Sequence, residues 1–144
     1  MGNKTSSYRF VNFEDIQNYI HNQNVNIILI STLPDNSYDL IIPKTIHYKD
    51  EIDIMNNMLK ENTHCPIYIY GKNTNDYTIY QKYEQLLQLG FTNVYLYCGG
   101  LFEWLCLQDI YGNDEFPLSK KENDILKYKP HSDFIHSYST SIKY

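Results

Sequence analysis

The sequence lacks alanine, has a single arginine and contains no long hydrophobic run. The absence of alanine beside 15 tyrosines indicates a bias in coding composition rather than a function. The strongest apolar run, residues 25–30, is interrupted by Asn26, whereas roughly 18–20 apolar residues are needed to cross a bilayer. Arg9 is the only arginine and the net charge is −5, whereas nucleic-acid-binding domains usually carry a basic stripe and a pI above about 9. These absences exclude a transmembrane helix and predict no nucleic-acid partner.

Cysteine is too scarce and too scattered for a disulfide framework or a structural zinc site. Cys65, Cys98 and Cys106 are odd in number and form no Cys-x-x-Cys pair, and the histidines show no metal-ligand spacing. We therefore expect reduced thiols, no metal and no cofactor. The N-terminal region has neither the apolar stretch of a secretory signal nor the Arg-rich pattern of a transit peptide, so we expect a cytoplasmic protein.

The residues that are present suffice for one folded domain with an appendage. The chain has 144 residues, of which 42% are hydrophobic and 20% charged. Short β-rich runs alternate with helical periodicity, which is typical of an α/β sheet built from βαβ units. The pattern predicts strands at 8–11, 26–32, 45–47, 66–70 and 93–98, and helices at 13–20, 49–61, 76–89 and 99–112. Asn12 and Asn75 are placed to cap helices, and Gly90 to end one.

The order of elements predicts a mainly parallel central sheet flanked by helices over residues 8–112. Beyond Gly112 the composition becomes polar, and the one apolar cluster is Ile125-Leu126. We expect residues 113–144 to form a C-terminal extension that packs at 125–128 and frays after about Ser132.

The residue types and spacing of two motifs resemble the second half of a rhodanese-like domain. Leu86 to Val94 reads LLQLGFTNV, close to the family's L-x-x-x-G-F-x-N-V, and Cys98 to Trp104 reads CGGLFEW, close to x-G-G-x-x-x-W. The first half agrees more loosely, through Phe13 to Ile16 and through the segment LIIPKT at 40–45. The resemblance covers roughly residues 8–112 and implies the rhodanese fold.

The loop after the strand at 66–70 departs from the active members of this family. The resemblance places Gly71 where active rhodaneses have their catalytic cysteine, and Asp76 where a basic residue often stands. The loop consists of Gly71, Lys72, Asn73, Thr74, Asn75 and Asp76. Sulfur transfer requires a thiolate, and an aspartate opposes an anionic substrate. The sequence therefore predicts a catalytically inactive module for interaction or scaffolding, with a protein partner that it does not identify.

Three alternatives remain open at this stage. The loop can be a working cradle for an anion or a partner, or a relict turn whose Asn and Asp residues only cap the helix. Cys98 ends a predicted strand before a helix N-terminus, so a sulfurtransferase or thiol enzyme with its nucleophile moved to Cys98 is the rival function. A phosphatase is a weaker third candidate. Dual-specificity phosphatases share the fold, but they need the cysteine and arginine that this loop lacks.

The N-terminal segment, residues 1–7, carries a separate signal. Met1 to Ser6 matches M-G-x-x-x-[ST], the pattern for myristoylation of Gly2 after removal of Met1. A single myristoyl chain binds membranes only weakly, and no nearby cysteine or polybasic patch would reinforce it. The motif thus predicts a lipid-modified Gly2 and a reversible association with the cytoplasmic face of a membrane.

Overall fold

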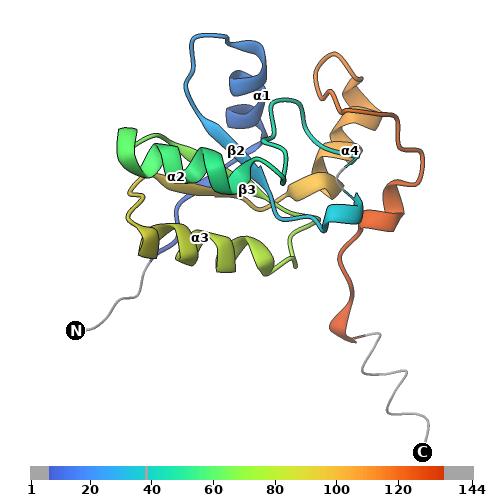
Figure 1. Cartoon of the computed structure of the whole chain (residues 1–144). Coiled ribbons are helices and arrows are strands. Elements are labelled where there is room, and N and C mark those ends of the chain that lie inside the picture. The colour runs from blue at the N-terminus through green and yellow to red at the C-terminus, as the bar shows by residue number, and fades with distance from the viewer. Residues whose placement is uncertain (1–6, 38, 135–144) are drawn as a thin grey trace, which may run out of the picture.

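The computed structural model describes residues 7–37 and 39–134 and has an α/β architecture (Figure 1). Its strands are β1 (Phe10–Val11), β2 (Ile28–Ser31), β3 (Ile67–Tyr70) and β4 (Val94–Tyr97). Its α-helices are α1 (Phe13–His21), α2 (Glu51–Glu61), α3 (Thr78–Leu89) and α4 (Gly100–Tyr111), and two 3₁₀ turns are η1 (Asp35–Ser37) and η2 (Ile125–Tyr128). None of the described helices is long and apolar enough to cross a membrane.

The four strands form one parallel sheet in the order β1-β4-β3-β2. In register, Ile28 of β2 lies opposite Ile67 of β3, which lies opposite Val94 of β4. All four residues of β2 are buried, as expected for a strand covered on both faces. The carboxyl ends of β2, β3 and β4 therefore lie side by side at one edge of the sheet.

Side chains of β2, β3 and β4 enter two separate cores, one on each face of the sheet. On one face, α2 and α3 cover Ile28, Ile30 and the other members of a cluster that includes Met55, Ile79, Tyr83 and Leu86. On the other face, α1 and α4 cover Leu29, Tyr70 and Tyr97, and Trp104 of α4 is fully buried there. Figure 1 shows α3 on one side of the sheet and α1 and α4 on the other. This arrangement confirms the predicted fold class.

Several predicted boundaries were wrong by a few residues. The first strand is limited to Phe10–Val11, and β2 begins at Ile28. The strand predicted at 45–47 is reduced to one isolated bridge between Leu29 and Thr45. Helices α2 and α3 each begin two residues later than predicted, at Glu51 and Thr78, because turns occupy the residues immediately before them.

The predicted helix ends were partly correct. The side-chain oxygen of Asn12 accepts hydrogen bonds from the backbone N–H groups of Glu14 and Asp15. The Asp15 carboxylate in turn accepts the backbone N–H of Asn12, and the two sets of bonds form a capping box. Gly90 ends α3 in the left-handed conformation, with φ of 116°, and Phe91 N donates to Leu86 O. Asn75 does not cap α3, because the carboxylate of Asp76 accepts the N–H of Thr78 instead.

The C-terminal extension packs against the domain along much of its described length. Phe116 is buried against Trp104, with ring centroids 5.0 Å apart, and the indole N–H of Trp104 donates to Pro117 O at 2.9 Å. Farther along, Ser119 N donates to Ile41 O, and Lys120 pairs with Asp39. Tyr128 in η2 is buried as well. The extension is thus part of the folded unit from Phe116 to Tyr128, where it reaches the loop that follows β3.

Candidate functional site

The loop of residues 71–76 begins at the carboxyl end of β3. Tyr70, the last residue of β3, is fully buried, and Gly71 follows it directly. The Tyr70 hydroxyl accepts the N–H of Ile42 at 3.1 Å and lies 2.8 Å from the hydroxyl of Thr45. Burial raises the pKa of Tyr70 to about 12. The segment 40–45 is therefore attached to the strand that carries the loop.

The carboxylate of Asp76 fills the interior of the loop. One of its oxygens accepts the N–H of Lys72 at 2.8 Å, and the other accepts the N–H of Thr78 at 3.1 Å. The Thr78 hydroxyl also bonds this carboxylate and lies 2.8 Å from the Thr32 hydroxyl. A Cβ atom built on Gly71 would lie 2.3 Å from the nearer Asp76 oxygen and 2.9 Å from the Thr32 hydroxyl oxygen. The space for a side chain at position 71 is thus occupied by an internal carboxylate.

Several polar backbone groups of the loop are also engaged within the protein. Asn75 N donates to the side-chain oxygen of Asn73, and Asp76 N donates to Asn73 O. The carbonyls of Gly71 and Lys72 accept the N–H groups of Leu101 and Phe102 at the start of α4. These bonds favour the interpretation of the loop as a capping turn over that of an open anion cradle.

Gly100 allows the loop to lie directly against α4. Its φ is 65°, and a Cβ there would meet Gly71 O at 2.7 Å and Asn73 N at 2.9 Å. Only glycine accommodates both that conformation and that approach. Gly100, the second glycine of the sequence motif, therefore serves the contact between α4 and the loop.

The extension closes over one side of the loop. The side-chain amide of buried Asn73 donates to Tyr128 O at 2.9 Å, and the amide of Asn75 donates to His131 O at 3.1 Å. Two loop residues thereby fix the path of the chain from η2 to His131.

A cavity of about 400 Å³ remains between the loop and the extension; we call it the loop groove. Its basic side chains are Lys72, Lys127, Lys129 and His131. Its apolar side is formed by Leu33, Pro34, Tyr77 and Leu126. The sequence analysis missed the contribution of the extension, although the cluster Lys127-Tyr128-Lys129 was a usable signal.

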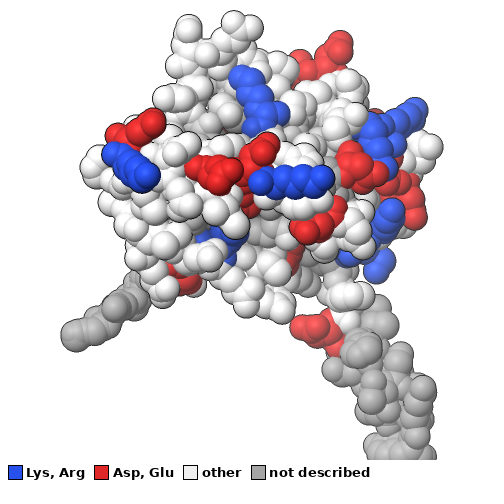
Figure 2. All heavy atoms as spheres, viewed as in Figure 1, with Lys and Arg blue, Asp and Glu red and all other residues white. Residues whose placement is uncertain are grey.

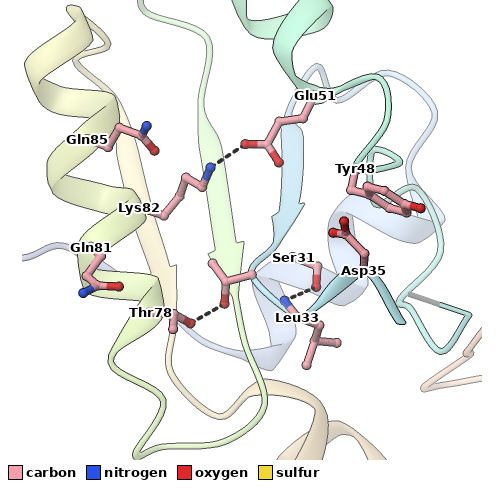
Figure 3. Close-up of a pocket in the computed structure, with 10 residues that line it drawn as sticks. Ser31, Leu33, Asp35, Tyr48, Glu51, Thr78, Gln81, Lys82 and Gln85 are labelled. Carbon is pink, nitrogen blue, oxygen red and sulfur yellow. Dashed lines mark hydrogen bonds and ion pairs between the residues drawn. The ribbon is translucent and has the colours of Figure 1, made fainter. Parts of the chain in front are cut away.

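A second cavity, of about 510 Å³, lies between α2 and α3 and shares Thr32, Leu33 and Thr78 with the loop groove. Figure 3 shows Glu51 and Lys82 pointing toward each other across it, and their charged atoms are 2.6 Å apart. Asp35 and Tyr48 also face this space (Figure 3). Because Lys82 is neutralised by Glu51, this cavity offers no free cation.

Cys98 lies apart from both cavities. It directly follows β4, is half-buried against the core covered by α2 and α3, and its sulfur is 3.5 Å from the Tyr80 hydroxyl. It is not among the residues that line either cavity. Within residues 7–37 and 39–134, no three His, Cys, Asp or Glu side chains gather in a way that could hold a metal ion. Gly2 lies outside the described residues.

Known proteins share this fold and, in part, this sequence. Residues 12–106 match the family described as "Rhodanese-like domain". The single-domain sulfurtransferase RDL2 of Saccharomyces cerevisiae is similar in structure, with a TM-score of 0.56 and 18% identity over 80% of this chain and all of that one. The Alr3790 protein of Anabaena sp. gives a TM-score of 0.54 and 18% identity over 71% of this chain and 88% of its own. No curated protein sequence matches.

At these identities the structural likeness establishes the fold alone, whereas the family match extends over more than half of the sequence. Sulfurtransferases and non-catalytic modules both occur among rhodanese-like domains. This chain belongs to the rhodanese-like domain family.

Proposed function

We propose that this protein is a non-catalytic rhodanese-like module that binds a protein partner at the edge of the sheet where the loop lies. The observation that carries the proposal is the position of Asp76. Its carboxylate occupies the space next to Gly71, where a catalytic cysteine side chain would have to lie. Gly71 has no side chain that could carry a sulfur atom, and the Asp76 carboxylate leaves no room for one.

Electrostatics supports the same conclusion. A fixed negative charge inside the loop repels anionic sulfur donors such as thiosulfate. It would also raise the pKa of any thiol placed next to it, which would lower the fraction of reactive thiolate. The fold is that of the rhodanese-like family, while the interior of this loop holds a carboxylate.

The test is intact-mass analysis of the native protein after incubation with thiosulfate and with 3-mercaptopyruvate. A competent single-domain sulfurtransferase serves as the positive control. We expect no mass increase from a bound sulfur atom, whereas the positive control gains one. A sulfur adduct on the native protein, removed by cyanide, would overturn the proposal.

Variants of the thiols identify the source of any adduct. Cys98→Ser tests the rival function in which the nucleophile has moved to Cys98. Cys106→Ser is the matched control, because Cys106 is also half-buried but lies within α4. An adduct lost only in Cys98→Ser would establish a thiol enzyme with a relocated nucleophile.

We further propose that Gly2 is myristoylated and that the lipid gives the module a weak, reversible hold on the cytoplasmic face of a membrane. The support is the N-terminal sequence MGNKTS. Mass spectrometry of the N-terminal peptide from the native cells tests this, with Gly2→Ala as the unmodifiable control. An unmodified Gly2 in those cells would refute it.

A further inference from the structure

The loop groove brings two unpaired lysines of this acidic chain to one cavity. Lys72 and Lys129 line it and form no ion pair with any described residue. Lys127 lies 3.9 Å from Glu122 and 5.6 Å from the centre of the Tyr128 ring, so its charge is partly satisfied. The one acidic residue that lines the groove is Asp76, whose carboxylate is bonded inside the loop.

Two other lysines near the groove are paired with acidic residues. Figure 2 shows Lys side chains at the right of the molecule, over the extension, with acidic side chains among them. Lys120 is 2.6 Å from Asp39, and Lys82 in the neighbouring cavity is 2.6 Å from Glu51. Lys121 of the extension also forms no ion pair with a described residue, but the cavity that it lines contains Asp109 and Glu122, whereas the one carboxylate at the loop groove is bonded inside the loop.

The same groove also exposes large apolar side chains. Leu126 is 65% exposed and Tyr77 is 67% exposed, and Pro34 lies beside them in the lining. Exposed apolar groups that adjoin charged ones are typical of a surface used for binding. The hydrogen bonds from Asn73 and Asn75 to the extension hold the two sides of the groove together.

We propose that the loop groove binds an extended acidic segment of a protein partner, with carboxylates on Lys72 and Lys129 and an apolar side chain on Leu126 and Tyr77. This inference rests on the proposed function, since it names the chemistry of the partner. Charge complementarity selects the occupant: the protein carries a net charge of −5, so a local cluster of unpaired lysines selects an anionic ligand. Residues 135–144 contain no Asp or Glu, so that segment does not supply the carboxylates.

The interior of the loop does not compete for this ligand. Asp76 already accepts the N–H groups of Lys72 and Thr78, and its negative charge repels a small anion there. The ligand is therefore held by side chains of the loop and the extension together, outside the position of the family's reactive group. Residues of the extension take part in recognition for this reason.

The experiment measures the fluorescence anisotropy of a short labelled peptide that alternates aspartate with leucine, titrated with the full-length protein. The comparison peptide has asparagine in place of aspartate. We expect the acidic peptide alone to bind, and raised salt to weaken it because the lysines are exposed. Equal binding of the two peptides would overturn the role of the carboxylates, and no binding of either would overturn the proposal as a whole.

Charge reversals locate the site. Lys72→Glu and Lys129→Glu should each weaken binding by roughly tenfold, since an attraction between exposed charges becomes a repulsion. Lys60→Glu is the matched control, because Lys60 is an exposed residue at the far end of α2 and the change in net charge is identical. If Lys60→Glu weakens binding as much as the groove variants, the attraction is not local and the proposal fails. Circular dichroism confirms that each variant is folded.

The apolar half of the groove has its own pair of variants. Leu126→Ala should weaken binding by about three- to fivefold through the loss of buried apolar area. Ile110→Ala, which truncates a side chain of α4 that is 69% exposed, should leave it unchanged. Binding of phosphatidylserine vesicles through Lys72 and Lys129, without peptide binding, would show that the groove recognises a membrane surface instead and would refute the proposal.

The sulfur-adduct measurement distinguishes a failure of this inference from a failure of the proposed function. If the protein binds the peptide and also forms a sulfur adduct, the proposal that it is non-catalytic is wrong, whereas the proposal that the loop groove binds an acidic segment stands. If the protein forms no adduct and binds no peptide, only the proposal for the loop groove is wrong.

Discussion

At the scale of single residues, the contact between Gly71 and Asp76 determines what the loop can do. Gly71→Ala places a methyl group 2.3 Å from a carboxylate oxygen that two N–H groups hold in position. We expect this substitution to lower the free energy of unfolding by about 2 kcal/mol, the usual range for overpacking. Urea denaturation of the variant and the native protein measures the difference.

A double-mutant cycle tests the cause of that loss. Asp76→Ala alone should destabilise the protein by about 1 kcal/mol, because it removes a cap from α3. In that background the methyl group of Gly71→Ala meets no carboxylate, so it should cost much less than in the native protein. Strictly additive effects would show that the carboxylate does not fill the space next to Gly71.

Tyr70 gives a second prediction at this scale. Tyr70→Phe removes the hydroxyl that accepts the buried N–H of Ile42 and contacts Thr45. An unpaired buried donor costs about 1–3 kcal/mol, so the free energy of unfolding should fall by that amount. Tyr111→Phe is the control, because Tyr111 is 63% exposed, and it should change stability by less than about 0.5 kcal/mol. Equal effects of the two variants would contradict the assigned role of Tyr70.

The sequence could predict which residues form the loop but not how their side chains are oriented. The motif spacing placed Gly71 after a buried strand and Asp76 at the end of the loop, and both placements agree with the structure. That Asp76 turns inward depends on the backbone conformation of the loop and on the Thr32 and Thr78 hydroxyls nearby. Thr32 comes from a segment distant in sequence, so local reasoning did not reveal the contact.

At the scale of elements, the extension behaves as a further layer of the domain. Phe116 lies between Phe13 of α1 and Trp104 of α4, with centroid distances of 5.7 and 5.0 Å, and is 3% exposed. Phe116→Ala should reduce the free energy of unfolding by about 3 kcal/mol, through lost transfer energy and a cavity. Thermal or urea denaturation measures this loss.

Phe10→Ala is the matched control for that prediction. Phe10 lies in the short edge strand β1 and is 58% exposed, so its truncation should cost less than about 1 kcal/mol. A loss for Phe116→Ala no larger than that for Phe10→Ala would show that the extension is not part of the cooperative unit.

Elements with strong periodicity were predictable, whereas in the extension only the packing at 125–128 was expected. β2, β3 and β4 were expected within two residues of their observed bounds, because parallel strands buried on both faces read as continuous apolar runs. Phe116 has only Pro117 and Leu118 as apolar neighbours in a polar stretch, so no periodic pattern marked it as buried. Its partners on α1 and α4 are distant in sequence, and only the tertiary fold brings them together.

At the scale of the whole molecule, the buried tyrosines make stability depend on alkaline pH. Burial raises the pKa of Tyr70 to about 12, and burial together with the Glu103 carboxylate raises the pKa of Tyr97. Burial also raises the pKa values of Tyr19 and Tyr68. In the unfolded chain tyrosine titrates near pH 10, so the folded state holds these protons more tightly than the unfolded state does.

The sign of the effect follows from this difference. The stability linked to Tyr70 is fully present below about pH 10 and is lost as the pH rises toward about 12, where the unfolded chain releases the proton first. One pKa unit corresponds to about 1.4 kcal/mol, so Tyr70 contributes a loss on the order of 2–3 kcal/mol across this interval. Urea denaturation of the native protein at a series of pH values from about 8 to about 11 should show a steepening fall. Tyr70→Phe should be less stable at neutral pH but should lose less on raising the pH, since it lacks the titrating group. Parallel pH curves for the two proteins would mean that the Tyr70 hydroxyl does not titrate with a raised pKa, and that the alkaline loss arises elsewhere in the molecule.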